Sequence, residues 1–302
     1  MARLVGAQAD EVVVMNGLTV NLHLFMTSFY RPTPQRHKIL IEEHAFPSDH
    51  FAVESQITTR GLDPATSLVT VKPRPGEETL CTEDIVAAIA DNGPELALVL
   101  LPGVQYYTGQ VLPMAEIVAA GHKAGAMVGL DLAHAVGNVE LQLHDWGADF
   151  AAWCTYKYLN AGPGSIAGGF VHERHLGTGP IPRLHGWWGH DKATRFEMKN
   201  KFIPIPTAEA WQLSNAPILS MAPVLASLEI FEAAGGMAPL RAKSEQMSAY
   251  FDYLLDERLA GKVRSITPRD LSQRGCQLSL EVVAPGVEGL EVFERLQQAD
   301  VE

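Results

Sequence analysis

This sequence has little cysteine, no long apolar run and no excess of basic residues. Only 3 of the 302 residues are cysteine and none forms a CxxC pair, which argues against a disulfide framework and a cysteine zinc site. No apolar run approaches the roughly 18 residues that a membrane-spanning helix needs. Acidic residues outnumber basic ones by 35 to 23, for a net charge of −12, so we expect neither nucleic acid nor an anionic membrane as a partner.

Signals for export and for metal chemistry are also absent. The first residues lack the charged and then apolar pattern of a signal peptide, so we expect a cytoplasmic protein. No Walker loop or GxSxG motif occurs, and the HERH string at 172–175 is not the HExxH of zinc hydrolases. We therefore expect no metal site, and we interpret His144 and Asp145 as a polar turn.

The order of apolar and amphipathic segments indicates an α/β fold. Strands are expected at 11–15, 38–41, 67–71, 96–101, 127–132, 150–154 and 166–172, and helices between them at 18–30, 47–59, 82–90 and 115–124. Such alternation predicts a mainly parallel sheet with helices on both faces. After Gly235 and Gly236 the pattern changes to a small α+β unit, so we place a large domain at 1–235 and a small one at 236–302.

An aspartate and a lysine stand at the ends of neighbouring predicted strands. Asp131 interrupts the apolar run 127–132, where a buried acid needs a cationic or hydrogen-bonding partner. Lys157 follows the apolar run 150–154 and precedes a glycine-rich turn. A pyridoxal phosphate enzyme needs this pair, because the lysine forms the Schiff base and the carboxylate keeps the ring nitrogen protonated. Each residue taken alone would rather indicate a core acid and a surface lysine, and the flanking motifs favour the cofactor site.

Three further segments offer groups that suit such a cofactor. A strand, a glycine turn and a helix that opens with Thr19 form an anion site, although Thr19 could simply cap its helix. Phe46 could stack on a planar ring or belong to the core. His134 could donate a hydrogen bond to the ring or serve only the structure.

Seven strings in this sequence, taken together, resemble the kynureninase family. They are LTVNLH, EEHAFPSDH, LDLAHAVGN, HDWGADFAAWCTYKYLNAG, GWWGH, TRF and SNAPI, and they run in the family's order from Leu18 to Asn215. The resemblance implies a PLP-dependent transferase-like fold of type I. It also implies hydrolysis of L-kynurenine, or its 3-hydroxy form, to anthranilate, or 3-hydroxyanthranilate, and L-alanine, a hydrolase reaction of tryptophan catabolism and NAD biosynthesis.

The resemblance also implies roles for individual residues. The catalytic residues are Lys157, Tyr156 and Asp131. The residues that bind pyridoxal 5′-phosphate are Leu18, Thr19, Phe46, Pro47, Ser48, Asp49, Asp131, His134, Tyr156, Lys157, Trp187 and Asn215. Of these, Trp187 and Asn215 reach the cofactor phosphate of the neighbouring subunit, which implies a homodimer with shared active sites.

This chain departs from the family's pattern in two respects. Pro102 stands where some members have a hydroxyl group near the cofactor, and proline cannot donate a hydrogen bond. The resemblance further implies that parts of both ends, including an arginine that binds the substrate carboxylate, are absent from this sequence.

Two alternatives remain open. The first is another fold-type-I pyridoxal phosphate enzyme, desulfurase-like or aminotransferase-like, although Cys154 lies in an apolar strand, where a thiol is normally inert. The second is a non-catalytic, truncated protein of the same fold, which would bind the cofactor without cleaving kynurenine.

Overall fold

A seven-stranded sheet forms the centre of the computed structural model, which describes all residues except 178, 180 and 302. The strand order among these residues is β1-β7-β6-β5-β4-β2-β3. The strands are β1 (Val12–Val14), β2 (Lys38–Glu42), β3 (Leu68–Val71), β4 (Leu96–Pro102), β5 (Met127–Asp131), β6 (Phe150–Trp153) and β7 (Gly168–Val171). Strands β2 to β6 pair in parallel, whereas β7 is antiparallel to both of its neighbours.

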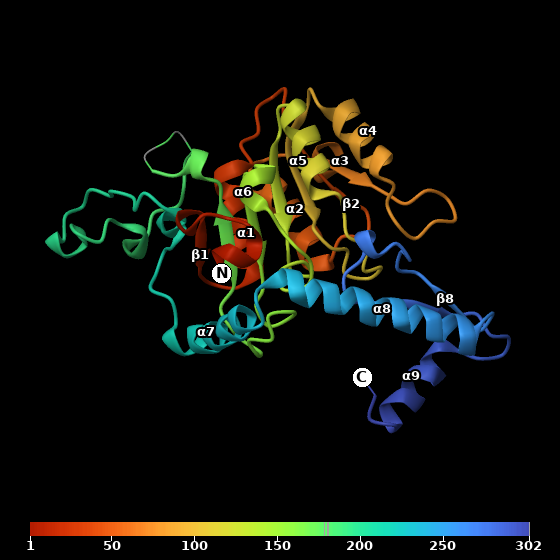
Figure 1. The fold of residues 1–302 in the computed structure, drawn as a ribbon. Helices are drawn as coiled ribbons and strands as arrows, with labels where there is room; N and C mark the ends of the chain where they lie inside the picture. Colours follow the sequence, from red (N-terminus) through yellow and green to blue (C-terminus); the bar gives the residue numbers. More distant parts are fainter. Residues whose placement is uncertain (178, 180, 302) are drawn as a thin grey trace.

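Helices cover both faces of this sheet (Figure 1). They are α1 (Leu18–Phe29), α2 (Pro47–Thr58), α3 (Pro64–Ser67), α4 (Thr82–Asn92), α5 (Met114–Lys123) and α6 (Leu143–Trp146). Side chains alternate between the faces along each strand, so Val99 packs in one core with α4 and α5, and Leu98 packs in the other with α1 and α2. The predicted α/β architecture with helices on both faces is confirmed.

One glycine in the sheet is required by close packing. Gly129 in β5 lies directly beside the Phe150 ring, and a Cβ atom at this position would clash with that ring. Phe150 in turn stacks on Phe29 of α1, with the ring centroids 5.0 Å apart. The glycine therefore lets α1 pack closely on the centre of the sheet.

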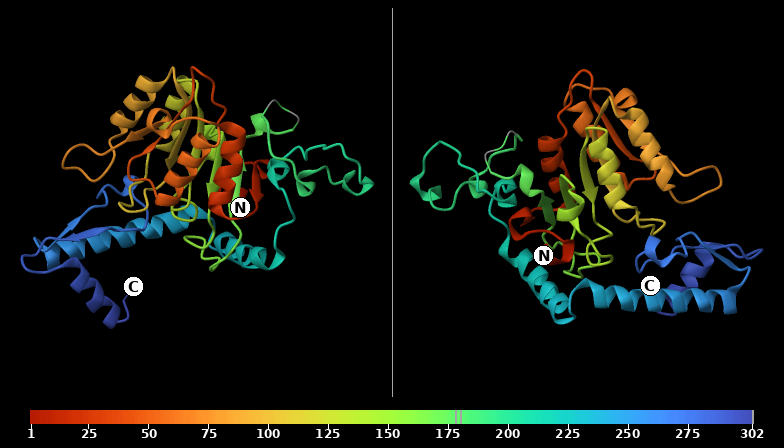
Figure 2. Two further views of the ribbon diagram at one scale, coloured as in Figure 1. Left: turned by 180° about the vertical axis from the view of Figure 1, so that it is seen from behind. Right: turned by 45° about the horizontal axis from the view of Figure 1, so that its top comes forward.

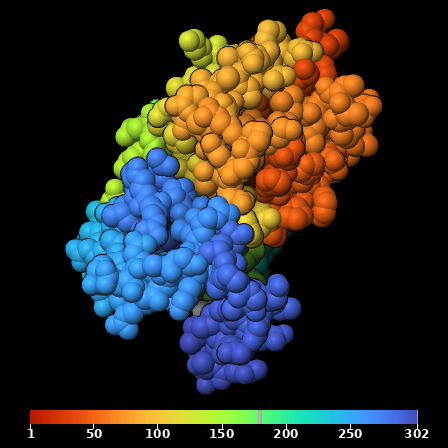
Figure 3. Space-filling model, turned by 90° about the vertical axis from the view of Figure 1, so that its right-hand side faces the viewer, coloured from red at the N-terminus to blue at the C-terminus, as the bar shows by residue number. Residues whose placement is uncertain are grey.

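After β7 the chain leaves the sheet, and its later helices pass along the lower edge of the sheet (Figures 1 and 2). An arm from about residue 181 to 207 extends away from the body and carries the short 3-10 helices Trp187–Gly189 and Arg195–Glu197. Helices α7 (Ile218–Ala233) and α8 (Met237–Leu259) then lead to a two-stranded antiparallel sheet of β8 (Val263–Ser265) and β9 (Leu280–Val282), and to α9 (Gly289–Gln298). Seen from the side in Figure 3, these last residues form a mass below the sheet region.

Element positions agree with the prediction except at a few ends. The strand expected at 166–172 is shorter, since β7 spans only Gly168–Val171. The expected polar turn at His144 is the short helix α6. Within the described residues no single helix has the length and hydropathy of a membrane span, whereas α7 and α8 pass that test jointly, bent by 79° at their junction.

Candidate active site

A cavity of about 660 Å³ opens at the carboxyl edge of the parallel strands. This is where an α/β sheet usually binds its ligand, because the loops after several strands converge there. It is lined by Gly17, Leu18, Thr19, Val20, Glu42, Phe46, Ser48, Asp49, Pro102, Val104, Tyr106, Asp131, Ala133, His134, Tyr156 and Lys157. Nine of the predicted site residues therefore meet in one cavity although they come from four separate segments of the chain.

Lys157 is held by two neighbours in this cavity. Its Nζ lies 2.9 Å from Nε2 of His134 and 5.6 Å from the centroid of the Phe46 ring. Burial, together with the nearby ammonium, lowers the pKa of His134 to about 4, so the imidazole is neutral near pH 7 and accepts the hydrogen bond from Lys157. His134 Nδ1 is buried and has no partner among the described residues, which leaves one donor available for a bound group.

Two carboxyl groups face each other across the cavity floor. Asp131, at the end of β5, accepts a hydrogen bond of 2.7 Å from the backbone N–H of Ala133 and shares another with the Asp49 side chain. Burial, followed by the charge of Asp131, raises the pKa of Asp49, and burial likewise raises the pKa of Asp131. The pair therefore retains a proton that an incoming cationic ring nitrogen could replace.

Glu42 is a third acid at this site that the sequence analysis did not single out. It ends β2, is buried, and lines the cavity; burial raises its pKa from 4.5 to about 7. The available signal was the pair of glutamates at the end of a predicted strand, which begins the EEHAFPSDH string. Tyr106, whose ring meets Phe46 edge to face at 5.3 Å, was also missed because nothing in its local sequence separates it from Tyr107.

The raised pKa of Glu42 predicts a specific pH dependence of stability. Between pH 4.5 and 7 the folded chain holds a proton that the unfolded chain loses, so this residue stabilises the fold below that window and the stabilisation is lost as the pH rises through it. We expect Glu42→Gln in the cofactor-free chain to gain about 2–3 kcal/mol in unfolding free energy over the parent between pH 4.5 and pH 8. Urea unfolding at both pH values measures this.

The neighbouring exposed glutamate provides the matched control. Glu43→Gln removes the same charge from solvent and is expected to show no such pH-dependent gain. If the unfolding free energies of Glu42→Gln and the parent changed in parallel with pH, the Glu42 carboxyl would not have the raised pKa described above.

The opposite wall of the cavity is suited to an anion. Gly17 precedes the first turn of α1, has no side-chain cap and has open space around its Cα. The first turn of α1 contains no acid, so its free N–H groups and its dipole favour negative charge. The Thr19 and Ser48 hydroxyls, from the first turns of α1 and α2, lie 2.8 Å apart. Two helix starts and two hydroxyls thus converge where a phosphate would lie.

The described residues fit the pyridoxal 5′-phosphate expected from the sequence. The helix starts suit its phosphate, the half-exposed Phe46 ring suits its planar ring, Asp131 suits its ring nitrogen, and Lys157 suits its aldehyde. The unpartnered Nδ1 of His134 supplies a donor that the protein itself leaves unused.

Tyr156 is the most exposed of the predicted catalytic groups, at 49%, and its ring opens onto the cavity. Burial, and then the neighbouring Cys154, raise the pKa of its hydroxyl, so the phenol is protonated at neutral pH. Cys154 itself is buried, and burial raises the pKa of its thiol.

Three predicted site residues lie outside the cavity of the single chain. Pro47 is the first residue of α2 and adjoins the lining without facing it. Trp187 lies in the arm, half exposed, where its indole contacts the Arg195 backbone, and Asn215 is exposed before α7. The contact of Trp187 and Asn215 with the cofactor phosphate of a neighbouring subunit remains a prediction.

Comparison with known proteins gives the family. Residues 1–178 match the family model described as Aminotransferase class-V, and residues 240–301 match that of the Kynureninase C-terminal domain. The chain is 56% identical over 301 residues to a protein named kynureninase from Xanthomonas campestris pv. campestris (strain B100), covering 100% of this chain and 70% of that protein. It is 59% identical over 279 residues to a kynureninase from Myxococcus xanthus (strain DK1622), covering 92% and 65%.

Solved structures share the fold at much lower identity. A cysteine desulfurase from Thermococcus onnurineus NA1 superposes with a TM-score of 0.77 at 20% identity, over 99% of this chain and 70% of that one. A mutant of C-DES with glycine covalently linked to its PLP cofactor gives a TM-score of 0.78 at 19% identity, over 99% and 74%. The chain shares the fold of these enzymes at low sequence identity, whereas more than half of its residues are identical to those of kynureninases. The chain therefore belongs to the kynureninase family.

Proposed function

We propose that this chain hydrolyses L-kynurenine, or 3-hydroxy-L-kynurenine, with pyridoxal 5′-phosphate as its cofactor. The products are anthranilate, or 3-hydroxyanthranilate, and L-alanine. The observation that carries the proposal is that Asp131, Lys157 and the start of α1 face one cavity in a chain 56% identical to kynureninases over its length. Incubation with pyridoxal phosphate and kynurenine, followed by anthranilate fluorescence, tests it; cofactor binding without anthranilate would favour the non-catalytic alternative.

The cavity residues divide the work of holding the cofactor. The start of α1, with Thr19 and Ser48, binds the phosphate; Phe46 packs on the ring; and Asp131, fixed by the Ala133 N–H, holds a proton on the ring nitrogen. When bound, the cofactor supplies an electron sink for the bonds of the substrate α-carbon. The hydrogen bond from the Asp49 side chain lowers the pKa of Asp131 and so favours the carboxylate that pairs with a protonated ring nitrogen.

Lys157 is both the attachment point and the general base. Its Nζ, once free, takes the proton from the substrate α-carbon. The neutral imidazole of His134, 2.9 Å away, orients the amine without adding a second positive charge. Water then adds to the side-chain carbonyl, the bond between that carbonyl carbon and the β-carbon breaks, and the β-carbon gains a proton. The protonated phenol of Tyr156 at the mouth of the cavity is placed to move these later protons.

The hydroxyl pair at the proposed phosphate site makes a testable contribution to affinity. We expect Thr19→Ala and Ser48→Ala each to weaken pyridoxal phosphate binding about 10-fold, because each removes one hydrogen bond to a charged group. Thr59→Ala, a threonine at the far end of α2, is the control and should bind normally. Titration of the cofactor by fluorescence measures the constants. Unchanged affinity for pyridoxal phosphate in both variants would show that the phosphate does not bind at this wall of the cavity.

The homodimer with shared sites is proposed on the exposed apolar surface of the arm and α7. Side chains more than half exposed there include Phe196 (75%), Met198 (74%), Ile218 (79%) and Leu219 (89%). Exposed apolar surface of this kind is typical of a protein interface. It adjoins Trp187 and Asn215, which the family resemblance assigns to the neighbouring subunit's cofactor phosphate.

Mixed dimers distinguish a shared site from a self-contained one. Lys157→Ala and Trp187→Ala subunits, each weak alone, are expected to regain activity when unfolded and refolded together, because a mixed dimer contains one site with both side chains. In an equal mixture this amounts to about a quarter of all sites. Absence of any recovery, with dimers formed, would place Trp187 in its own subunit's site. The control is Lys157→Ala unfolded and refolded alone, which should regain no activity.

The desulfurase-like alternative is not favoured. It needs a reactive cysteine, and Cys154 is 2% exposed at the end of β6 with a raised thiol pKa. The solved desulfurases resemble this chain at only 20% identity, which speaks for the fold alone.

The domain division near Gly235 is also proposed. Gly235 and Gly236 both adopt positive φ, 87° and 86°, between α7 and α8, a conformation that favours glycine and turns the chain sharply. The small sheet of β8 and β9 follows this turn. A large unit of residues 1–235 and a small unit of 236–302 agree with this break, and the cytoplasmic location remains a prediction from sequence.

A further inference from the structure

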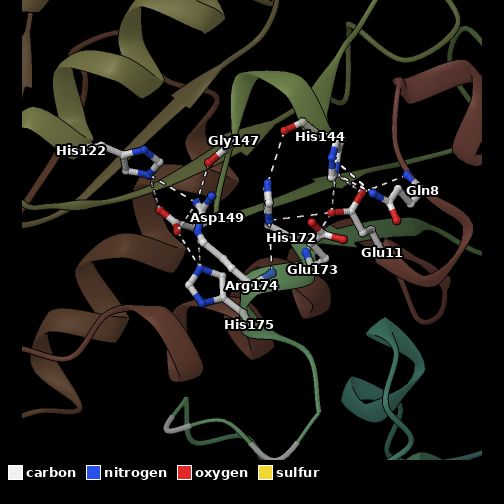
Figure 4. Close-up of polar contacts among 10 residues, drawn as sticks. All are labelled: Gln8, Glu11, His122, His144, Gly147, Asp149, His172, Glu173, Arg174 and His175. Carbon is white, nitrogen blue, oxygen red and sulfur yellow. Dashed lines mark hydrogen bonds and ion pairs between the residues drawn. The ribbon is translucent and has the colours of Figure 1, made fainter.

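A second cluster of chemically active side chains is drawn in Figure 4. The strand directions place it at the edge of the sheet opposite to Lys157. Glu11 ends a 3-10 turn before β1, His144 lies in α6 and His172 follows β7. A Glu11 carboxylate oxygen is 3.0 Å from His144 Nδ1 and 3.8 Å from His172 Nδ1. One ligand atom from each residue lies within 4.8 Å of the other two.

The cluster is enclosed rather than superficial. The side chain of Glu11 is fully buried, and those of His172 and His144 are 12% and 28% exposed. The two imidazole rings stack, with centroids 5.1 Å apart and planes 14° from parallel. Three potential ligands therefore stand in fixed positions with one side open to solvent.

Surrounding hydrogen bonds hold these ligands in place. The Glu11 carboxylate accepts from the backbone N–H of Gln8 at 2.9 Å and of Glu173 at 2.8 Å. His172 Nε2 lies 3.3 Å from the carbonyl oxygen of His144 and can donate to it, so Nδ1, on the Glu11 side, is the acceptor. Without a metal ion this Nδ1 accepts a hydrogen bond of 3.3 Å from the backbone N–H of Arg174, which the ion would replace. A carbonyl on the remote nitrogen of a ligand histidine is typical of metal sites, because it fixes the tautomer and the ring orientation.

A neighbouring cluster shows what a plain ion pair looks like in this protein. Asp149 contacts two histidines, His122 at 3.0 Å and His175 at 2.7 Å, but the Arg174 guanidinium also binds it at 2.6 Å. The side-chain partners recorded for Glu11 are histidines. Among the described residues, no arginine or lysine forms an ion pair with Glu11 as Arg174 does with Asp149.

We propose that Glu11, His144 and His172 bind one Zn²⁺ ion, with water as the fourth ligand. Imidazole nitrogen and carboxylate oxygen are ligands that zinc accepts, whereas Mg²⁺ and Ca²⁺ prefer oxygen alone. Ligands about 2.0–2.1 Å from one tetrahedral ion lie roughly 3.3 Å apart, close to the two separations recorded here. The ion replaces the proton that His144 otherwise shares with Glu11.

The position implies a structural role rather than a catalytic one. Glu11 directly precedes β1, and β1 leads through Gly17 into α1, whose start lines the cavity. The ion ties this N-terminal segment to α6 and to the end of β7, and so stabilises the edge of the sheet that carries α1.

Metal binding to the purified chain tests the proposal without reference to activity. After removal of metals by a chelator, we expect one equivalent of Zn²⁺ to bind and raise the melting temperature, and Co²⁺ to bind with visible d–d absorption bands. His144→Gln and His172→Gln are expected to lose the Co²⁺ spectrum and to weaken Zn²⁺ binding at least about 100-fold. His122→Gln removes a histidine from the Asp149 cluster instead and should bind as the parent does.

Folding of each variant is checked by circular dichroism. Should a glutamine variant unfold, His144→Cys, which supplies another zinc ligand, is expected to bind Co²⁺ with an added thiolate charge-transfer band. No Zn²⁺-dependent rise in melting temperature and no Co²⁺ spectrum in the folded parent would overturn the proposal and leave the cluster an ion pair only. Binding that persists in both folded histidine variants, or no thiolate band in the cysteine variant, would also overturn it.

Discussion

Lys157→Ala is expected to lower kcat/KM for kynurenine by at least about 10⁴-fold, because it removes the cofactor's attachment point and the general base together. The variant should also lack the visible absorbance of a covalently bound cofactor. Its Nζ is the only amine in the described lining of the cavity, so no neighbouring side chain can take over both tasks. Absorbance spectra and anthranilate fluorescence measure the two effects.

A matched control and a charge-conserving substitution sharpen this test. Lys123→Ala removes an exposed lysine at the end of α5 and should leave both readouts unchanged. Lys157→Arg keeps the positive charge and the hydrogen bond to His134 but cannot act as a base at neutral pH. Full absorbance or full activity in Lys157→Ala would show that another residue anchors the cofactor.

Asp131→Asn is expected to lower kcat about 10³-fold while leaving the cofactor bound. The amide preserves the shape and can keep the hydrogen bond from Ala133, but it cannot hold a proton on the ring nitrogen. Since charge develops on the ring only during the reaction, the loss should fall on kcat more than on KM. Steady-state kinetics separates these two constants.

Asp131→Glu is the comparison for this second prediction. It retains the charge and is expected to retain more activity than Asp131→Asn, reduced by the poorer fit in a buried position. Equal activity in Asp131→Asn and the parent would show that the carboxylate does not serve the ring, and would shift that role to Asp49.

Much of the candidate site was predictable because its residues occur in short strings at strand ends. Parallel strands bring their carboxyl ends to one edge, so Asp131 and Lys157, which follow neighbouring strands, were expected to meet. Thr19 was predictable for the same reason, since helices that start after strands point their N–H groups at that edge, whereas Ser48 came from the family resemblance.

Other parts required three-dimensional contacts that no local string encodes. Glu42 begins its string as one of two adjacent glutamates, and only burial distinguishes it from the exposed Glu43. Tyr106 and Tyr107 are similarly adjacent, yet only Tyr106 lies against Phe46 within the cavity lining.

The order of motifs along the chain was enough to indicate the family, the α/β class, the cofactor and the lysine proposed to bind it. Secondary-structure periods and strand-end residues are local properties, and they survive in a linear reading. The meeting of Glu11 with His144, 133 residues away, was decided by tertiary structure. His172 joins this pair because the antiparallel strand β7 brings it back to the amino edge of the sheet, beside the start of β1. No local sequence pattern indicates that return of the chain.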